Sequence, residues 1–102
     1  MRYDAFRKRL VEAVLHAHGD TPEALRRAVL EHGSTPPPPA LASYVDTVKR
    51  HAYKVTDADI VSLQQAGQSD DTLFEITVLA SVGAALHRLD RGMAALRGEE
   101  PD

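Results

Sequence analysis

The order of apolar and polar residues along the chain predicts a series of amphipathic helices. In the first, apolar side chains recur at steps of three and four residues between Tyr3 and His18, which is the spacing of one helical face. These apolar positions are Tyr3, Phe6, Leu10, Ala13, Val14 and Ala17. Because glycine disfavours a continuing helix, we expect this first helix to stop at Gly19.

A second helix is predicted after this glycine. Thr21, Pro22 and Glu23 combine a capping residue, a proline at the first helical position and an acid in the first turn. This helix is expected to continue to about His32 and to end at Gly33. Residues 34–39 then contain four prolines, which cannot form a helix or a central strand, so they predict a short extended spacer.

The third predicted helix follows the spacer, with Pro39 suited to its first position. Helical spacing continues to about Lys54. The residues on its apolar face are Leu41, Tyr44, Val45, Val48 and Ala52.

Capping residues predict the starts of two further helices. Thr56 with Asp59 three positions later predicts the start of a short helix that Gly67 ends, and Ser69 predicts the start of the longest helix. The long helix carries a seam with alternating steps of three and four, formed by Leu79, Val82, Leu86, Leu89, Met93 and Leu96. A second apolar face is formed by Phe74, Val78 and Ala85.

These patterns together predict an all-α fold. We expect one domain over residues 1–102, built as a compact bundle of about five helices around the long C-terminal helix, with a frayed tail at 98–102. A helix that is apolar on two faces is central to a fold or to an interface between subunits. We therefore expect a homo-oligomer.

Composition excludes several classes of function. With 12 basic and 15 acidic residues the net charge is −3, and no stripe of Lys and Arg favours a nucleic-acid partner. The longest apolar stretch is much shorter than the roughly 20 residues of a membrane span, so we expect no membrane partner and a cytoplasmic location. Metal-ligand motifs, nucleotide-binding loops and cysteines are all absent, so we expect no metal and no cofactor.

Three side chains are candidates for acid–base chemistry. Glu75 lies four residues before Leu79 on the apolar seam, where burial would perturb its carboxylate, and His51 and His87 lie inside predicted helices. The structural alternative for Glu75 is an ion pair with a base such as Arg50. For His87 the structural alternative is a half-exposed ring bonded to a neighbouring carbonyl or acid.

The last three helices also carry a family resemblance. Val55-Thr56-Asp57-Ala58-Asp59-Ile60, Leu63-Gln64-Gln65-Ala66-Gly67 and the segment 69–93 resemble the alkylhydroperoxidase D-like and carboxymuconolactone decarboxylase-like superfamily, with the likeness covering about residues 41–96. The resemblance implies a small helical oligomer. It also places the two cysteines and the histidine of the family's redox motif at Pro39, Ala42 and Asp46, so the thiols are missing.

Two functional hypotheses follow. Without a thiol, peroxidase chemistry of the family's kind is excluded, so the leading hypothesis is a non-catalytic, self-associating helical protein that has lost the redox site of this scaffold. The alternative is a cysteine-independent, decarboxylase-like or lactone-processing enzyme that uses Glu75 with His51 or His87. This alternative requires those side chains to meet in one pocket.

Overall fold

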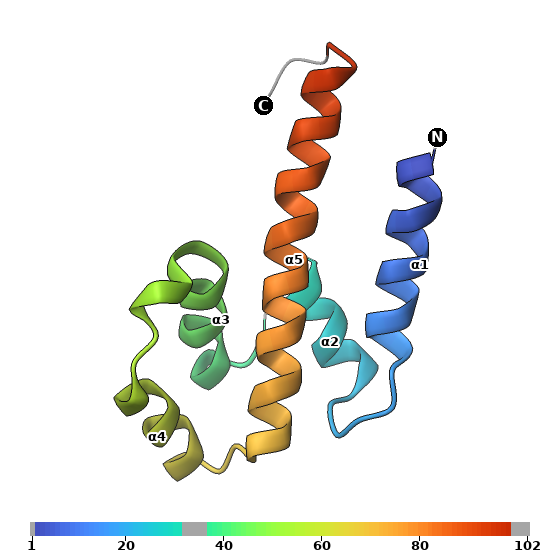
Figure 1. Cartoon of the computed structure of the whole chain (residues 1–102). Coiled ribbons are helices and arrows are strands. Elements are labelled where there is room, and N and C mark those ends of the chain that lie inside the picture. The colour runs from blue at the N-terminus through green and yellow to red at the C-terminus, as the bar shows by residue number, and fades with distance from the viewer. Residues whose placement is uncertain (1, 32–36, 99–102) are drawn as a thin grey trace.

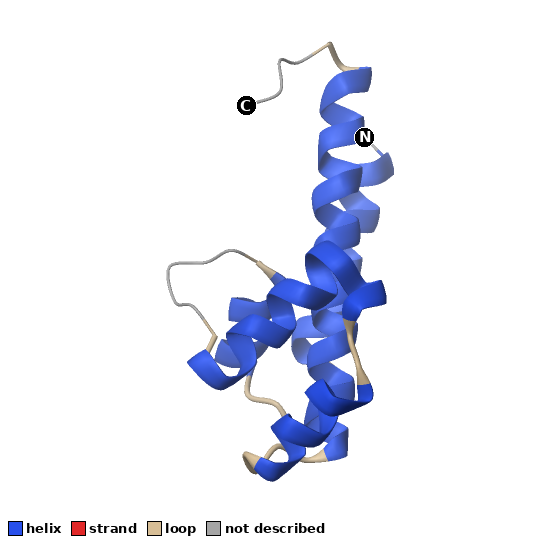
Figure 2. Cartoon of the chain, turned by 90° about the vertical axis from the view of Figure 1, so that its left-hand side faces the viewer, coloured by secondary structure: helices blue, strands red, loops and turns tan. Residues whose placement is uncertain are grey.

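The computed structural model describes residues 2–31 and 37–98, and every regular element within them is helical (Figures 1 and 2). The predicted all-α class is therefore confirmed. The elements are α1 (Arg2–His16), α2 (Glu23–Leu30), α3 (Pro39–His51), a 3-10 turn η1 (Ala52–Lys54), α4 (Asp57–Gln65) and α5 (Asp70–Leu96). Helix α2 ends at Leu30, two residues before the predicted end at about His32. His32, Gly33, residues 34–36 of the proline spacer and residues 99–102 of the tail lie outside the described residues.

Helix α5 is the axis of the fold. Helices α2 and α3 make its most extensive contacts, while α1 lies on one side of it and α3 and α4 lie on the other (Figure 1). The C-terminal half of α5 extends beyond α3 and α4, and the first half of α1 lies beside part of it (Figure 1). The molecule is consequently elongated, with extents of 47 × 28 × 22 Å.

The core surrounds the first half of α5. Ile76 of α5 and Val29 of α2 are completely buried, and the core draws further residues from every α-helix. On the predicted seam, Leu79 and Leu86 are buried, but Leu89 and Leu96 are exposed. The seam prediction therefore does not hold for Leu89 and Leu96, because these two residues lie on the side of α5 that the other described helices leave open.

The predicted starts of α3, α4 and α5 and the predicted end of α4 are confirmed, whereas α1 ends at His16 and α3 at His51, three residues before the predicted Gly19 and Lys54. The Thr56 hydroxyl accepts a hydrogen bond from the Asp59 backbone N–H while the Asp59 carboxylate accepts one from the Thr56 N–H, which completes a capping box. Ser69 caps α5 by accepting from the Thr72 N–H, and Gly67 adopts φ of 101° after α4. Pro39 begins α3, as its fixed φ favours.

The start of α2 differs from the prediction. Pro22 occupies the capping position, with no side-chain cap, and Glu23 is the first helical residue. Thr21 does not cap the helix because its hydroxyl is engaged by Arg26 and Glu75. A tertiary interaction thus replaces the expected local one.

Helix α5 is relevant to the expectation, made from the sequence, that no segment of this chain crosses a membrane. Its 27 residues include an 18-residue window with a mean hydropathy of 1.2, which is long and apolar enough to cross a membrane by length and composition alone. One third of that window is buried inside the molecule, and the central helix of a soluble bundle meets the same criterion.

Candidate functional site

Glu75 lies in an ion pair that joins α5 to α2. Its side chain is 17% exposed and that of Arg26 is 5% exposed, with Arg26 Nη2 2.8 Å from Glu75 Oε1. The Thr21 hydroxyl donates to Oε1 at 3.0 Å, and the Asp20 backbone N–H donates to Oε2 at 3.0 Å. Both carboxylate oxygens are therefore occupied by donors from the chain itself.

Arg26 satisfies its guanidinium within the same cluster. Nη1 donates to the carbonyl oxygens of Val14 at 3.1 Å and Ala17 at 2.6 Å, and Nε donates to the hydroxyl of Thr21 at 2.8 Å and to its carbonyl at 3.0 Å. One buried arginine thus ties the end of α1, the loop after it and α5 to α2. Such a fully bonded cluster fixes the geometry of a core.

The ion-pair partner predicted for Glu75, a base such as Arg50, is wrong. Arg50 pairs with Asp46 on its own helix, at 2.8 Å between Nε and Oδ1, because α3 packs on a different side of α5 from the loop that holds Thr21. The sequence contained a signal for Arg26, which lies three and four residues before the core residues Val29 and Leu30 and so shares their helical face.

The surroundings of Glu75 make it a weak proton acceptor. Burial raises the pKa of its carboxyl group, but hydrogen bonds from Asp20 and Thr21 and the charge of Arg26 outweigh burial, so the pKa lies below its usual range. Glu75 is ionised at neutral pH and already bonded. These properties suit a structural ion pair better than a general acid or base.

The structure does not bring Glu75 to a common pocket with either histidine. Glu75 lines a pocket between α1 and α5, whereas His87 lines another between α3 and α5. The 12 positions that separate them on one helix correspond to about 18 Å. His51 lies exposed at the end of α3. Its ring is edge-on to that of Tyr53, with the two ring centroids 5.9 Å apart.

The pocket beside Glu75 is mainly apolar. It has a volume of about 170 Å³, and its walls include Val14 and Ala17 of α1 and Phe74 and Val78 of α5. Phe74 is exposed at its rim. This pocket therefore suits an apolar side chain.

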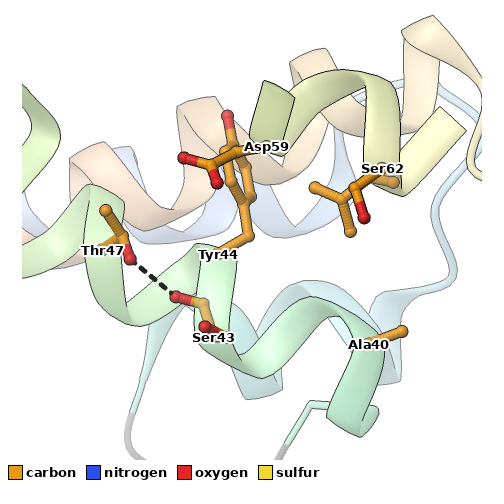
Figure 3. Close-up of a pocket in the computed structure, with 7 residues that line it drawn as sticks. Ala40, Ser43, Tyr44, Thr47, Asp59 and Ser62 are labelled. Atoms are coloured by element: carbon orange, nitrogen blue, oxygen red, sulfur yellow. Dashed lines mark hydrogen bonds between the residues drawn. The ribbon is translucent and has the colours of Figure 1, made fainter. Parts of the chain in front are cut away.

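A polar pocket between α3 and α4 offers little free chemistry. Figure 3 shows Asp59 and Tyr44 on its walls. The Asp59 carboxylate is used in the capping box, and the Tyr44 hydroxyl lies 2.6 Å from Thr77 Oγ1 in a hydrogen bond. These two polar groups therefore serve a helix end and the packing of α3 on α5.

Metal-binding clusters of three or more His, Asp or Glu side chains do not occur in the part of the chain that the structure describes. The Glu12 and His16 pair, which has helical i, i+4 spacing, forms a contact of 3.2 Å, and Glu23 lies 3.8 Å from the same ring nitrogen. All three side chains are largely exposed.

An uncharged line of exposed residues runs along α5 and is here named the α5 stripe. Its seven residues repeat at a spacing of 11, which keeps them on one narrow face of a straight helix. They are Phe74, Val78, Ser81, Ala85, Leu89, Gly92 and Leu96, and all are exposed. Sequence reasoning found Phe74, Val78 and Ala85 as a second apolar face but assigned Leu89 and Leu96 to the seam.

No family model, curated protein or solved structure matches this chain. The resemblance to the alkylhydroperoxidase D-like superfamily, which rests on residues 41–96, therefore stays a prediction.

Proposed function

We propose that this chain is a non-catalytic helical protein that associates with itself through the α5 stripe. The observation that carries the proposal is the exposure of large apolar side chains along one uncharged face of a 27-residue helix, which spans about 40 Å. Apolar surface of this extent on a soluble chain favours burial against a partner. Both carboxylate oxygens of Glu75 already accept hydrogen bonds from the chain itself, which supports the proposal that the protein is non-catalytic.

The order of side-chain sizes along the stripe favours two antiparallel copies related by a two-fold axis at Ala85. In that register Phe74 meets Leu96 of the partner subunit, Val78 meets the partner's Gly92, and Ser81 meets the partner's Leu89. Val78 and Leu89 then face the small residues Gly92 and Ser81, and Phe74 packs against Leu96 at both ends, so the two faces are self-complementary. A parallel pairing would instead oppose Phe74 to its own copy and leave the glycines facing each other.

The apolar pocket beside Glu75 fits the same arrangement. Phe74 and Val78 form one of its walls, and the partner's Leu96 would reach it in the antiparallel register. Leu96 is 80% exposed in the single chain, so its burial there removes a large apolar surface from water.

The oligomeric mass tests the proposal. Leu89→Asp places a charge in the middle of the stripe and is expected to yield a monomer in sedimentation equilibrium at concentrations where the unmodified chain is a dimer. Val61→Asp on α4 is the matched control, because Val61 is 46% exposed and Leu89 is 43% exposed. A chain that is monomeric at every concentration, or a dimer unaffected by Leu89→Asp, contradicts the proposal.

The absence of cysteine allows a test of the register. Ala85→Cys is expected to form an intermolecular disulfide on mild oxidation, because the two copies of this residue meet at the axis. Ser81→Cys should not, since two residues four positions from the axis are about 12 Å apart along the helices. The reverse result would rule out this antiparallel register.

A further inference from the structure

The groove between α3 and α5, here named the α3–α5 groove, gathers positive charge on an acidic protein. Two adjoining open pockets, of about 320 and 370 Å³, share Lys49, Arg50, Ala84 and Arg88. His87 lines the first and Tyr53 the second. Among the residues that the structure describes, Asp46 is the only acid lining either pocket, although the whole chain carries a net charge of −3.

Two of these cations have no ion-pair partner among the described residues. Asp46 is taken by Arg50 at 2.8 Å, which leaves Lys49 and Arg88 without a carboxylate in salt-bridge range. Lys49 is half-buried, and this burial lowers the pKa of its ammonium group, which the charge of Asp46 only partly offsets. An anion placed between Lys49 and Arg88 would relieve this unfavourable desolvation.

The shape of the groove adds an apolar wall and a small-residue floor. Ala84 of α5 lines both pockets and contributes little bulk to them. Val48 and the ring of Tyr53 border the neighbouring pocket, and Tyr53 is 80% exposed. Pockets that combine a few charged groups with apolar walls are typical of small-molecule sites.

We propose that the α3–α5 groove binds a small organic anion whose phosphate or carboxylate group lies between Lys49 and Arg88 and whose apolar part lies against Tyr53. The planar guanidinium of Arg88 presents a fork of donors that matches either anion, and Lys49 supplies a compact second charge. The inference does not rest on self-association, because Lys49, Arg88 and Tyr53 lie off the α5 stripe, although Ser81 of the stripe also lines the second pocket.

Phenyl phosphate and benzoate are suitable probes because each joins one of the two anions to a flat ring. In a two-dimensional NMR titration at constant ionic strength, we expect saturable shifts of the backbone amides of Lys49, Ala84 and Arg88. Benzyl alcohol, which has the ring without the charge, should leave these amides unshifted. The ratio of the two affinities shows which anion the groove prefers.

Substitutions in the groove then distinguish binding at a specific site from general electrostatic attraction to the protein surface. Lys49→Met and Arg88→Ala are each expected to weaken phenyl phosphate binding by about tenfold, the loss expected for a charge-assisted hydrogen bond. Arg9→Ala removes an equal charge from the exposed face of α1 and should leave the affinity unchanged. Tyr53→Ala should weaken phenyl phosphate but leave inorganic phosphate unaffected.

Three outcomes would overturn the proposal. These are shifts that never saturate, shifts spread equally over all cationic surfaces, and an Arg9→Ala effect as large as that of Lys49→Met. Thermal melting of each variant serves as a check on folding, and Arg88→Lys offers a second variant that keeps the charge but loses the fork. It should bind phenyl phosphate better than Arg88→Ala and less well than the unmodified chain.

Discussion

At the scale of single residues, the ion pair between Arg26 and Glu75 distinguishes this core from one held by apolar contacts alone. Arg26 is almost entirely buried and depends on Glu75 for charge balance. Gly19 is part of the same arrangement, because a side chain there would collide with the Glu75 carboxylate and with Arg26 Nη2. The pair therefore constrains a loop as well as two helices.

Glu75→Gln should destabilise the fold by about 3 kcal/mol at neutral pH, because it leaves the buried guanidinium of Arg26 without a counter-charge. Urea unfolding measures this loss. Glu23→Gln is the matched control, since Glu23 pairs with Arg27 at 3.1 Å on the exposed surface of α2, where such pairs contribute about 1 kcal/mol or less. Equal losses of stability for the two variants would show that the buried ion pair contributes no more to folding than the exposed one.

The effect of Glu75→Gln should also depend on pH. The folded-state pKa of Glu75 lies below its ordinary value of 4.5, so in acid the unfolded chain binds more protons and stability falls. The contribution is complete above pH 4.5 and is lost as the pH falls through the folded-state pKa. The stability difference between the unmodified chain and Glu75→Gln should therefore shrink in acid, and a difference that is constant from pH 7 to pH 3 would contradict the assignment.

At the scale of helices, α2 and α5 approach each other closely at one point. A Cβ atom on Gly83 would lie 2.5 Å from the carbonyl oxygen of Leu30, which is a backbone atom that cannot turn aside. We expect Gly83→Ala to cost about 1–3 kcal/mol in urea unfolding.

Gly92→Ala on the same helix meets no atom within 4 Å and should instead stabilise the chain by about 0.5–1 kcal/mol, through helix propensity. Both variants are measured at a protein concentration at which the chain is monomeric, because Gly92 lies on the α5 stripe and faces the partner's Val78 in the proposed dimer. If Gly83→Ala were as stable as Gly92→Ala, the helices would not be in contact at this point.

The interaction between α1 and the C-terminal half of α5 is less extensive than that between α2 and α5. Asp90 accepts hydrogen bonds from Arg7 Nε at 2.9 Å, from Arg7 Nη2 at 3.0 Å and from the Tyr3 hydroxyl at 2.6 Å. These bonds from Arg7 are the main reason that the pKa of Asp90 is lowered. The cluster is partly exposed, so its contribution to global stability is small.

Asp90→Asn should consequently loosen α1 without unfolding the protein. We expect faster amide hydrogen exchange in the first two turns of α1 and unchanged protection around Ile76 in the core. Arg50→Gln, which breaks the exposed pair with Asp46 on α3, should leave α1 unchanged. Unaltered exchange in α1 after Asp90→Asn would mean that other contacts hold this end.

At the scale of the whole molecule, two leucines three residues apart on α5 should behave differently. Leu86 is 3% exposed inside the core, whereas Leu89 lies on the α5 stripe. Leu86→Asp buries an unpaired charge and should cost at least about 3 kcal/mol, which unfolds a marginal domain. Leu89→Asp should change the oligomeric mass while the monomer keeps its helical circular dichroism. A Leu86→Asp variant that retains its melting temperature would contradict the placement of this residue in the core.

The sequence alone determined the local features of this protein. Thr56 with Asp59, Ser69, Gly67 and Pro39 mark helix ends through contacts or backbone angles within a few positions, and such short-range physics can be read without a structure. Periodicity likewise identified the all-α class and most of the buried residues of α3.

Only the tertiary structure decided which surfaces meet. Arg26 and Glu75 are separated by 49 positions, and their pairing depends on how α2 and the loop before it pack against α5, which no local pattern specifies. The same packing left Leu89 exposed although it has the spacing of Leu86, because helical periodicity shows that a face is apolar but not what covers it. The stripe runs from Phe74 to Leu96 along the side of α5 that the other described helices leave open, so its exposure is a property of the assembled fold.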